Sequence, residues 1–297
     1  MKQPIFAIIL MLASSSAAAL DVFSCEPEWA ALVTELAGER ANITVATTAF
    51  QDPHSLQARP SLLAAIRRAD LLVCTGADLE IGWLPLLLRR AGGAAIQRGN
   101  PGHFLAADYV RMLEVPAQID RSQGDIHPQG NPHIHLNPRN IVPIADQMTR
   151  RLIELDPVAK TEYQTRLTKF RTRWTDAVSG WEDRGSKLAG LRLASHHRSF
   201  SYLADWLGLN IVATLEPKPG IPPSGKHLAG LLERLSPQPP VAIIRTPYAN
   251  EKPSAWLSGR LGASALVLPY TVGGTDAAMD LFGLFDVTLA ALESVNP

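Results

Sequence analysis

The stretch Asp70-Leu71-Leu72-Val73-Cys74 decides the fold, because its apolar run continues without interruption almost to Gly76. A continuous run of this kind is typical of a parallel strand that is buried on both faces of its sheet. Strand-like and helical segments alternate before it, at residues 21–24, 28–36, 43–46 and 60–68. This alternation predicts a parallel sheet with helices on both sides.

The same alternation returns after a long helical region. Strand-like and helical segments are expected there at residues 191–195, 199–207, 211–215, 228–235, 241–245, 265–268 and 281–294. Between the two α/β regions, residues 138–155 and 157–188 are charged and carry apolar side chains at three- and four-residue spacing. A helix of about 30 residues would be about 45 Å long, enough to connect two lobes. Two ordinary packed helices fit the same periodicity.

We therefore expect an α/β protein of two lobes, each with a mostly parallel sheet flanked by helices, joined by a long connecting helix. The expected boundaries follow the changes in pattern. They place an export signal at residues 1–19, the N-terminal lobe at 20–140, the connecting helical region at 141–189 and the C-terminal lobe at 190–297.

The first residues carry the features of a cleavable secretory signal. Met1-Lys2 gives a positive start, residues 5–12 are apolar, and Ala17-Ala18-Ala19 offers a small-residue cleavage site. The apolar run is too short to span a membrane. The residues just before Cys25 do not form the small, apolar box that a lipid anchor would need. We expect a soluble product that is exported to the periplasm.

Composition fits a folded protein without a nucleic-acid partner. The 28 basic and 28 acidic side chains balance, so no strong field favours nucleic acid or an anionic membrane. The apolar content of 46% also argues against a disordered chain.

Cysteine occurs only twice, as Cys25 and Cys74. In an exported protein, two cysteines most economically form one disulfide. Both fall at the carboxyl ends of expected strands, the first and the third, which are often neighbours in doubly wound sheets. The alternative is a pair of buried free thiols.

Three histidines lie in short cassettes that are about 80 and about 64 residues apart, a spacing unlike that of a zinc finger. The cassettes are Asp52-Pro53-His54, Asn131-Pro132-His133 and His197-Arg198-Ser199-Phe200-Ser201-Tyr202. Proline fixes the backbone before the first two imidazoles, and His197 follows a strand at the edge where α/β folds collect ligands. Each histidine alone is more often a turn or capping residue, but together they indicate a metal site assembled by the whole fold.

These cassettes resemble those of the metal-binding periplasmic solute-binding proteins of ABC transporters, the ZnuA/TroA group. The resemblance runs from about Cys25 to the C-terminus and includes the segment Gly76-Ala77-Asp78-Leu79-Glu80. The tail, with Thr271-Val272-Gly273-Gly274 and then residues 280–286, is similar to the AztC-type zinc subgroup. The resemblance implies two lobes joined by a long helix, metal in the cleft, and delivery to an inner-membrane permease.

Carried over position by position, the resemblance makes His54, His133 and His197 the three histidine ligands. The neighbouring His196 is out of register with the aromatic residues of the cassette. The chain departs from the family pattern at the fourth ligand, because the family commonly has an aspartate after the last strand where this chain reads Leu268-Pro269-Tyr270.

Two carboxylates lie close to that departure from the family pattern, Asp276 and Asp280. We favour Asp276, on a glycine-rich loop that could fold back over the site, while Asp280 is expected to start the final helix. A water or an open position is the alternative.

Three neutral imidazoles and one carboxylate suit tetrahedral Zn²⁺. Copper and nickel also accept imidazole, whereas manganese prefers more oxygen ligands. Metal affinity should fall as the pH drops through the histidine range. His127 and His135 flank His133 in a loop and are either an accessory metal-collecting site or solvated loop histidines.

The predicted function is therefore capture of Zn²⁺ as cargo and its delivery to an inner-membrane ABC permease. We expect a monomer, with a periplasmic zinc metallochaperone as a conceivable second partner. A binding protein for Mn²⁺ or another divalent metal, and a metal-binding adhesin on the same fold, are the alternatives. An enzyme is not expected, because a zinc hydrolase needs a general base and no His-Glu-x-x-His motif supplies one.

Overall fold

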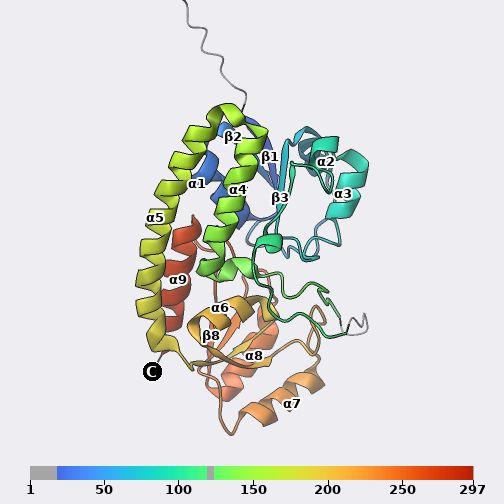
Figure 1. Cartoon of the computed structure of the whole chain (residues 1–297). Coiled ribbons are helices and arrows are strands. Elements are labelled where there is room, and N and C mark those ends of the chain that lie inside the picture. Colours follow the sequence, from blue (N-terminus) through green and yellow to red (C-terminus); the bar gives the residue numbers. More distant parts are fainter. Residues whose placement is uncertain (1–18, 119–123, 297) are drawn as a thin grey trace, which may run out of the picture.

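The computed structural model describes residues 19–118 and 124–296 of the chain. Nearly all of the predicted export signal therefore lies outside the described residues. Two lobes lie one above the other in Figure 1, and a long helix runs along the side of both. Within the described ranges, no helix combines the length and the apolar character needed to cross a bilayer.

The N-terminal lobe is built on a parallel sheet. Its strands are β1 (Leu20–Ser24), β2 (Ala41–Val45), β3 (Leu71–Cys74) and β4 (His103–Leu105). They are hydrogen-bonded in the order β2-β1-β3-β4, and every pair is parallel. The helices of this lobe are α1 (Pro27–Ala37), α2 (Pro60–Arg68) and α3 (Leu84–Ala91). The first and third strands are thus neighbours, as the sequence predicted.

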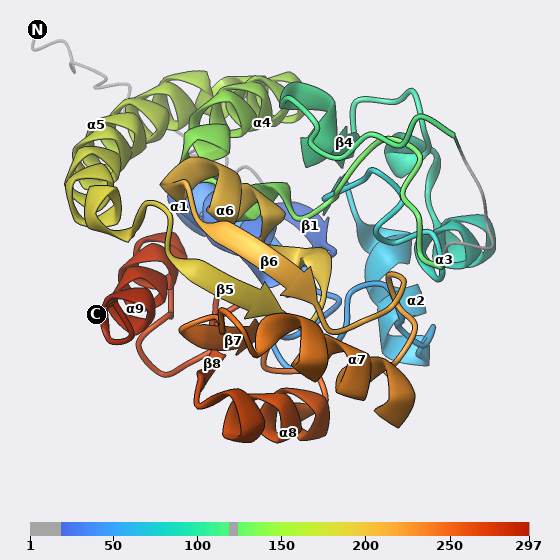
Figure 2. The ribbon, with the colours of Figure 1, turned by 90° about the horizontal axis from the view of Figure 1, so that it is seen from below.

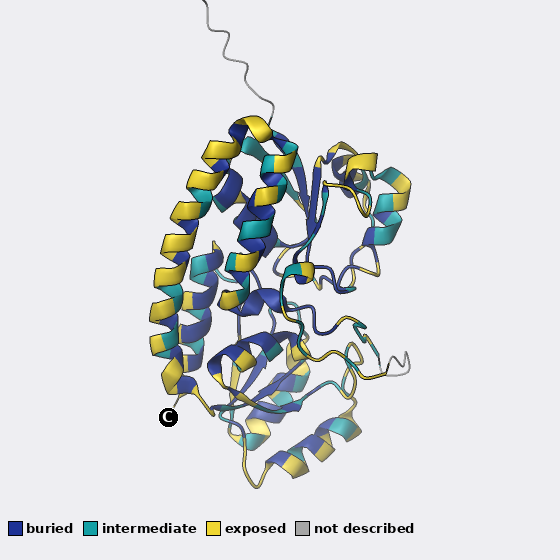
Figure 3. Cartoon of the chain, viewed as in Figure 1, coloured by how far each residue is buried: buried dark blue, intermediate teal, exposed yellow. Residues whose placement is uncertain are grey.

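Strand β3 is buried on both faces, as its apolar run predicted. Leu71 and Val73 belong to a large core that includes side chains of α1. Leu72 and Cys74 belong to a second core that includes side chains of α2 and α3. Side chains alternate across a strand, so a strand between two helical layers has no polar face. Figure 3 shows β3 in the buried colour.

The C-terminal lobe repeats this arrangement. Its strands are β5 (Arg192–Ser195), β6 (Asn210–Thr214), β7 (Ala242–Arg245) and β8 (Ser264–Val267). They lie side by side in the order β6-β5-β7-β8, again all parallel (Figure 2). The helices that follow the long helical region are α6 (Ser201–Leu207), α7 (Gly225–Leu235), α8 (Glu251–Leu261) and α9 (Leu281–Glu293). Both lobes are therefore parallel α/β units.

The connection between the lobes is made by α4 (Ile141–Leu155) and the 26-residue α5 (Lys160–Gly185). At 1.5 Å per residue, α5 is about 39 Å long. It contacts α1 of the N-terminal lobe and α9 of the C-terminal lobe. Its aromatic stripe is buried, and the large core to which the stripe belongs runs through both lobes. The predicted connecting helix is confirmed, and it packs against helices of both lobes.

Three elements were not predicted from the sequence: α3, β4 and α8. Strand β4 has only three residues, too few for an alternating pattern. Helix α3 has eight residues and contains Pro85 in its first turn. Helix α8 contains Pro253, and its apolar side chains do not form a clear stripe.

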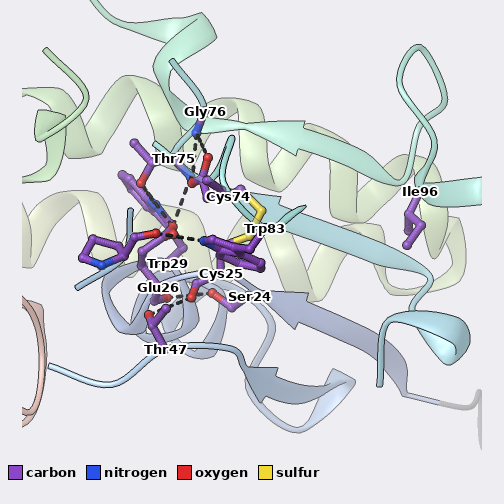
Figure 4. Close-up of a disulfide and its surroundings, with 12 residues drawn as sticks. Ser24, Cys25, Glu26, Trp29, Thr47, Cys74, Thr75, Gly76, Trp83 and Ile96 are labelled. Atoms are coloured by element: carbon purple, nitrogen blue, oxygen red, sulfur yellow. Dashed lines mark hydrogen bonds between the residues drawn. A yellow bond between two sulfur atoms is a disulfide. The ribbon is translucent and has the colours of Figure 1, made fainter. Parts of the chain in front are cut away.

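Cys25 and Cys74 form a disulfide, as the sequence predicted, with their Cα atoms 4.8 Å apart (Figure 4). The bond joins the carboxyl ends of β1 and β3, which are adjacent in the sheet. Both cysteines are fully buried in the core under α2 and α3. The loop that it closes contains β2 and His54.

A pair of buried acids, Glu26 and Glu80, lies beside the disulfide. Glu80 accepts hydrogen bonds from the backbone N–H groups of Thr75 and Gly76, at 2.8 Å and 3.2 Å. Glu26 accepts hydrogen bonds from the backbone and side chain of Thr75, both at 3.2 Å (Figure 4). Burial raises the pKa of Glu80 to about 7. Burial and then the charges of Glu80 and Glu28 raise the pKa of Glu26 well above its usual value.

Replacing Glu80 by glutamine should remove a pH-dependent part of the stability of the metal-free protein. The folded-state pKa is raised, so the contribution is full below about pH 4.5 and is lost as the pH rises through about 7. Relative to Glu80→Gln, the wild type should lose up to about 3 kcal/mol of unfolding free energy between pH 5 and pH 8.

Urea unfolding at a series of pH values measures this difference. Both proteins contain the same histidines. The pH-dependent contribution of the histidines to the unfolding free energy, which has the opposite sign, therefore cancels in the comparison. Glu39→Gln, at an exposed glutamate of the same lobe, is the control. Its unfolding free energy should have the same pH dependence as that of the wild type. Parallel pH profiles for Glu80→Gln and wild type would contradict the prediction.

Candidate metal site

His54, His133 and His197 come together between the lobes. His54 lies in the loop between β2 and α2, His133 lies before α4, and His197 follows β5. One ring nitrogen of each lies within 4.8 Å of the other two. The ring centroids are 5.5 Å to 5.6 Å apart. Segments that are far apart in the sequence thus deliver three imidazoles to one point.

Each of the three imidazoles is held through its Nδ1 atom. His54 Nδ1 lies 2.7 Å from Asp52 Oδ1, and His197 Nδ1 lies 2.7 Å from Glu216 Oε2. His133 Nδ1 lies 2.8 Å from the hydroxyl oxygen of Tyr270. Outer partners of this kind fix the orientation of metal-binding imidazoles in other proteins.

These contacts decide which nitrogen is available to a metal. An ionised carboxylate only accepts hydrogen bonds, so the Nδ1–H groups of His54 and His197 donate to their carboxylates. The lone pair of each ring is then on Nε2. A hydroxyl can accept as well as donate, so Tyr270 allows the same tautomer at His133. His54 Nε2 is buried and has no hydrogen-bond partner, as expected for a ligand atom.

Two residues of the site have pKa values that favour their deprotonated forms, His133 and Asp52. Burial, and then the neighbouring His197 and His54, lower the pKa of His133 well below its usual value. Burial opposes ionisation of Asp52, but its hydrogen bonds and charge attraction to His54 prevail and lower its pKa. His133 is therefore neutral and Asp52 ionised near neutral pH, and both states favour a bound cation.

A cleft of about 1080 Å³ leads to this group from both lobes. Its lining includes His54 and His197 together with four acids, Asp52, Asp78, Asp125 and Glu216. Among the described residues that line it, there is no lysine or arginine. Clefts lined by one sign of charge concentrate ions of the opposite sign, so this entrance favours cations.

The sequence-predicted fourth ligand, Asp276, does not lie with the three histidines. Its side chain is exposed on the loop before α9, and it is not part of the group that could hold a metal. Asp280 accepts a hydrogen bond from Gly283 N at 2.7 Å and caps α9, which confirms its predicted place at the start of that helix. His196 is also outside the group.

His135 is buried and contacts residues of both lobes. It is fully buried, so it is not a solvated loop histidine. Its Nε2 lies 2.8 Å from the carbonyl oxygen of Tyr270, and its Nδ1 lies 3.2 Å from the carboxylate of Glu28. Thr271 also donates a hydrogen bond to Glu28. His135 is not part of the group of three histidines, and its contacts with Glu28 and Tyr270 join the two lobes.

His127, the other predicted accessory residue, lies beside the three histidines. Its ring centroid is 5.3 Å from that of His54. Its Nδ1 is 3.1 Å from the carbonyl oxygen of Ala77. It lines two cavities that His197 also lines.

Three functional side chains were missed by the sequence reasoning: Asp52, Glu216 and Tyr270. Asp52 was seen only as part of a turn. Glu216 follows β6 at the carboxyl edge of its sheet, and this position was the signal that could have found it. Tyr270 lies in the segment Leu268-Pro269-Tyr270, and its hydroxyl contacts the predicted ligand His133.

Two parallel α/β lobes on one long helix, with imidazoles between them, define a class of metal-binding solute-binding proteins. The sequence profile of the family described as "Zinc-uptake complex component A periplasmic" matches residues 22–295. This chain belongs to that family. The family is one of solute-binding proteins for ABC transporters and not of enzymes, in agreement with the sequence-based prediction.

Solved structures share the fold at low sequence identity. A structure titled "Crystal structure of ZnuA" has a TM-score of 0.77 at 21% identity, covering 94% of this chain and 100% of that one. A manganese-bound mutant of a periplasmic metal-binding protein from Candidatus Liberibacter asiaticus has a TM-score of 0.74 at 17% identity, covering 92% and 98%. These likenesses establish the fold.

Curated relatives carry names for two metals. The manganese ABC transporter substrate-binding lipoprotein scaA of Streptococcus gordonii is 26% identical over 59% of this chain. The zinc-binding lipoprotein AdcA of Streptococcus pneumoniae R6 is 22% identical over 88% of it. The chain spans 59% and 53% of the lengths of these two relatives. Relatives therefore support a divalent metal as cargo without choosing between zinc and manganese.

Proposed function

We propose that this protein captures Zn²⁺ in the cleft between its lobes and delivers it to an inner-membrane ABC permease. His54, His133 and His197 are the proposed ligands. The observation that carries the proposal is that all three Nδ1 atoms are held by outer partners, leaving three Nε2 atoms for a metal. Three imidazole ligands are typical of tetrahedral zinc sites.

The donor set favours zinc over manganese. Imidazole suits zinc, while manganese prefers carboxylate, carbonyl and water ligands. The acids at the site, Asp52 and Glu216, are engaged by Nδ1 atoms and so balance the charge of the cation from outside its coordination sphere. The glycine-rich tail that is similar to the AztC-type zinc subgroup supports the same assignment.

Asp276, the fourth ligand expected from the sequence, lies outside the group formed by the three histidines. Asp276 would reach the histidines only if the loop before α9 carried its exposed carboxylate into the cleft. That movement, or a water ligand, would complete a tetrahedral site.

Export to the periplasm, a monomeric state and receipt of zinc from a metallochaperone complete the proposal. They rest on the signal-like N-terminus and on the resemblance. A mutant structure of a laminin-binding adhesin from Streptococcus agalactiae has the same fold, with a TM-score of 0.73, so the fold by itself does not select transport over adhesion.

Metal competition tests the cargo. The chain from residue 20 onward, freed of metal, should bind one Zn²⁺ and should retain it against an equal concentration of Mn²⁺. Chelator competition with Zn²⁺, Mn²⁺ and Cu²⁺ in separate titrations measures the order of affinity. Copper is expected to compete, because affinity order favours it at nitrogen sites. Tighter binding of Mn²⁺ than of Zn²⁺ would overturn the zinc assignment and favour the manganese alternative.

A further inference from the structure

His127 has the same bonding pattern as the three predicted ligands. A backbone carbonyl only accepts hydrogen bonds, so its Nδ1–H donates to Ala77 and the lone pair is on Nε2. His127 Nε2 is buried and has no hydrogen-bond partner. A buried polar atom without a partner is uncommon and calls for a physical reason, such as an ion.

His127 lies where it could bind the same metal as the other three histidines. Its centroid separation from His54, 5.3 Å, is similar to the 5.5 Å to 5.6 Å separations within the group of three. It is not a member of the set whose nitrogens all lie within 4.8 Å, so a small shift of its ring must accompany binding.

The segment that carries His127 is anchored to both lobes. On the N-terminal side, His127 contacts Ala77, which adopts a left-handed conformation with φ of 50°. On the C-terminal side, Asp125 N donates to Pro219 O at 2.9 Å. A side chain at Gly220 would collide with Asp125, so glycine permits this close approach. The histidine is therefore held across the cleft and is not a free loop residue.

We propose that His127 is the fourth ligand of the bound metal, completing a site of four imidazoles. This inference rests on the proposed function, because it concerns the same metal. A neutral fourth nitrogen in place of a carboxylate makes the site less suited to manganese and other hard cations. His127 is thus a residue that determines metal specificity, and Asp276 is not a ligand.

Counting imidazoles in the Co²⁺-loaded protein tests the inference. Each imidazole bound to Co²⁺ through Nε2 gives one exchangeable, strongly shifted Nδ1–H proton signal. The wild type should give four such signals, His127→Ala three, and Asp276→Ala four. His227→Ala is the matched control, because His227 Nε2 is also buried without a partner but lies on α7, outside the site. It should give four.

Zinc affinity provides a second measurement. His127→Ala should weaken Zn²⁺ binding about 100- to 1000-fold, as expected for the loss of one of four ligands, while Asp276→Ala and His227→Ala should stay within about threefold of wild type. His127→Asp should recover part of the zinc affinity and raise the affinity for Mn²⁺ relative to Zn²⁺. If His127 had a purely structural role, its substitution would not change the affinity for Mn²⁺ relative to Zn²⁺.

Three signals in the wild type, unchanged in His127→Ala, would overturn the inference and leave the proposed function standing. Loss of affinity in Asp276→Ala but not in His127→Ala would do the same and assign the position to Asp276. A different result would contradict the proposed function itself: the wild type would bind neither Co²⁺ nor Zn²⁺ tightly.

Discussion

Replacing His133 by alanine should abolish tight zinc binding while the protein remains folded. His133 is only 1% exposed, and it lies at the centre of the site, within contact distance of both His54 and His197. Structural zinc sites with four ligands gain about 10–16 kcal/mol in total, so one ligand accounts for about 2.5–4 kcal/mol. The expected loss of affinity is about 100- to 1000-fold.

Competition with a zinc chelator measures this loss. His103→Ala is the matched control. His103 is a partly buried histidine on β4 of the N-terminal lobe, and its Nδ1 contacts the carbonyl oxygen of Ile96. The control should bind zinc as the wild type does. Near-UV circular dichroism checks that both variants are folded. Retention of wild-type affinity by His133→Ala would remove the central ligand from the proposed site.

The fold could be predicted from the sequence because long, regular patterns determine it. The run before Gly76 identified β3, and the aromatic stripe that includes Trp174 and Trp181 identified α5. Elements with weak patterns were missed, as in the case of α8, where the segment contains a proline and its apolar side chains form no clear stripe. Tertiary packing stabilises such segments in place of local preference.

The candidate site was predictable only in part. Its histidines lie in recognisable cassettes, whereas the side chains that orient them do not. Glu216 is 19 residues from His197 in the chain, and Tyr270 is 137 residues from His133. The contact of His197 with Glu216 depends on the pairing of β5 with β6, and that of His133 with Tyr270 depends on how distant segments are brought together. The same reason explains why His127 and His135, close in sequence, have different environments.

The shared core limits how this protein can respond to metal. Buried side chains of both lobes belong to one cluster, and α5 contacts helices of each. The buried pair of His135 and Glu28, with Thr271, adds polar contacts across the same boundary. Opening the lobes as rigid bodies would break these contacts, so we expect metal exchange to involve loops at the cleft, including the segment of residues 124–128.

Removing the disulfide should destabilise the N-terminal lobe and weaken metal binding with it. Cys25 and Cys74 close a loop with a sequence separation of 49 residues. The chain-entropy relation gives about 4 kcal/mol for a loop of this size. His54 lies inside the closed loop, and β2 before it pairs only with β1 among the described strands. Loss of the cross-link therefore frees the segment that delivers this ligand.

The double variant Cys25→Ala with Cys74→Ala should show this loss in urea unfolding of the metal-free protein, together with a weaker zinc affinity, because the segment that carries His54 is less firmly held. Alanine avoids placing an unsatisfied hydroxyl in the apolar core. Reduced wild type is the control, because it loses the cross-link but keeps both sulfur atoms, so it separates the cross-link from the cavity that alanine leaves. A reductant should destabilise the wild type and leave the double variant unchanged. Equal stability of oxidised and reduced wild type would show that the β1–β3 pairing and the core beneath it hold His54 in place without the covalent bond.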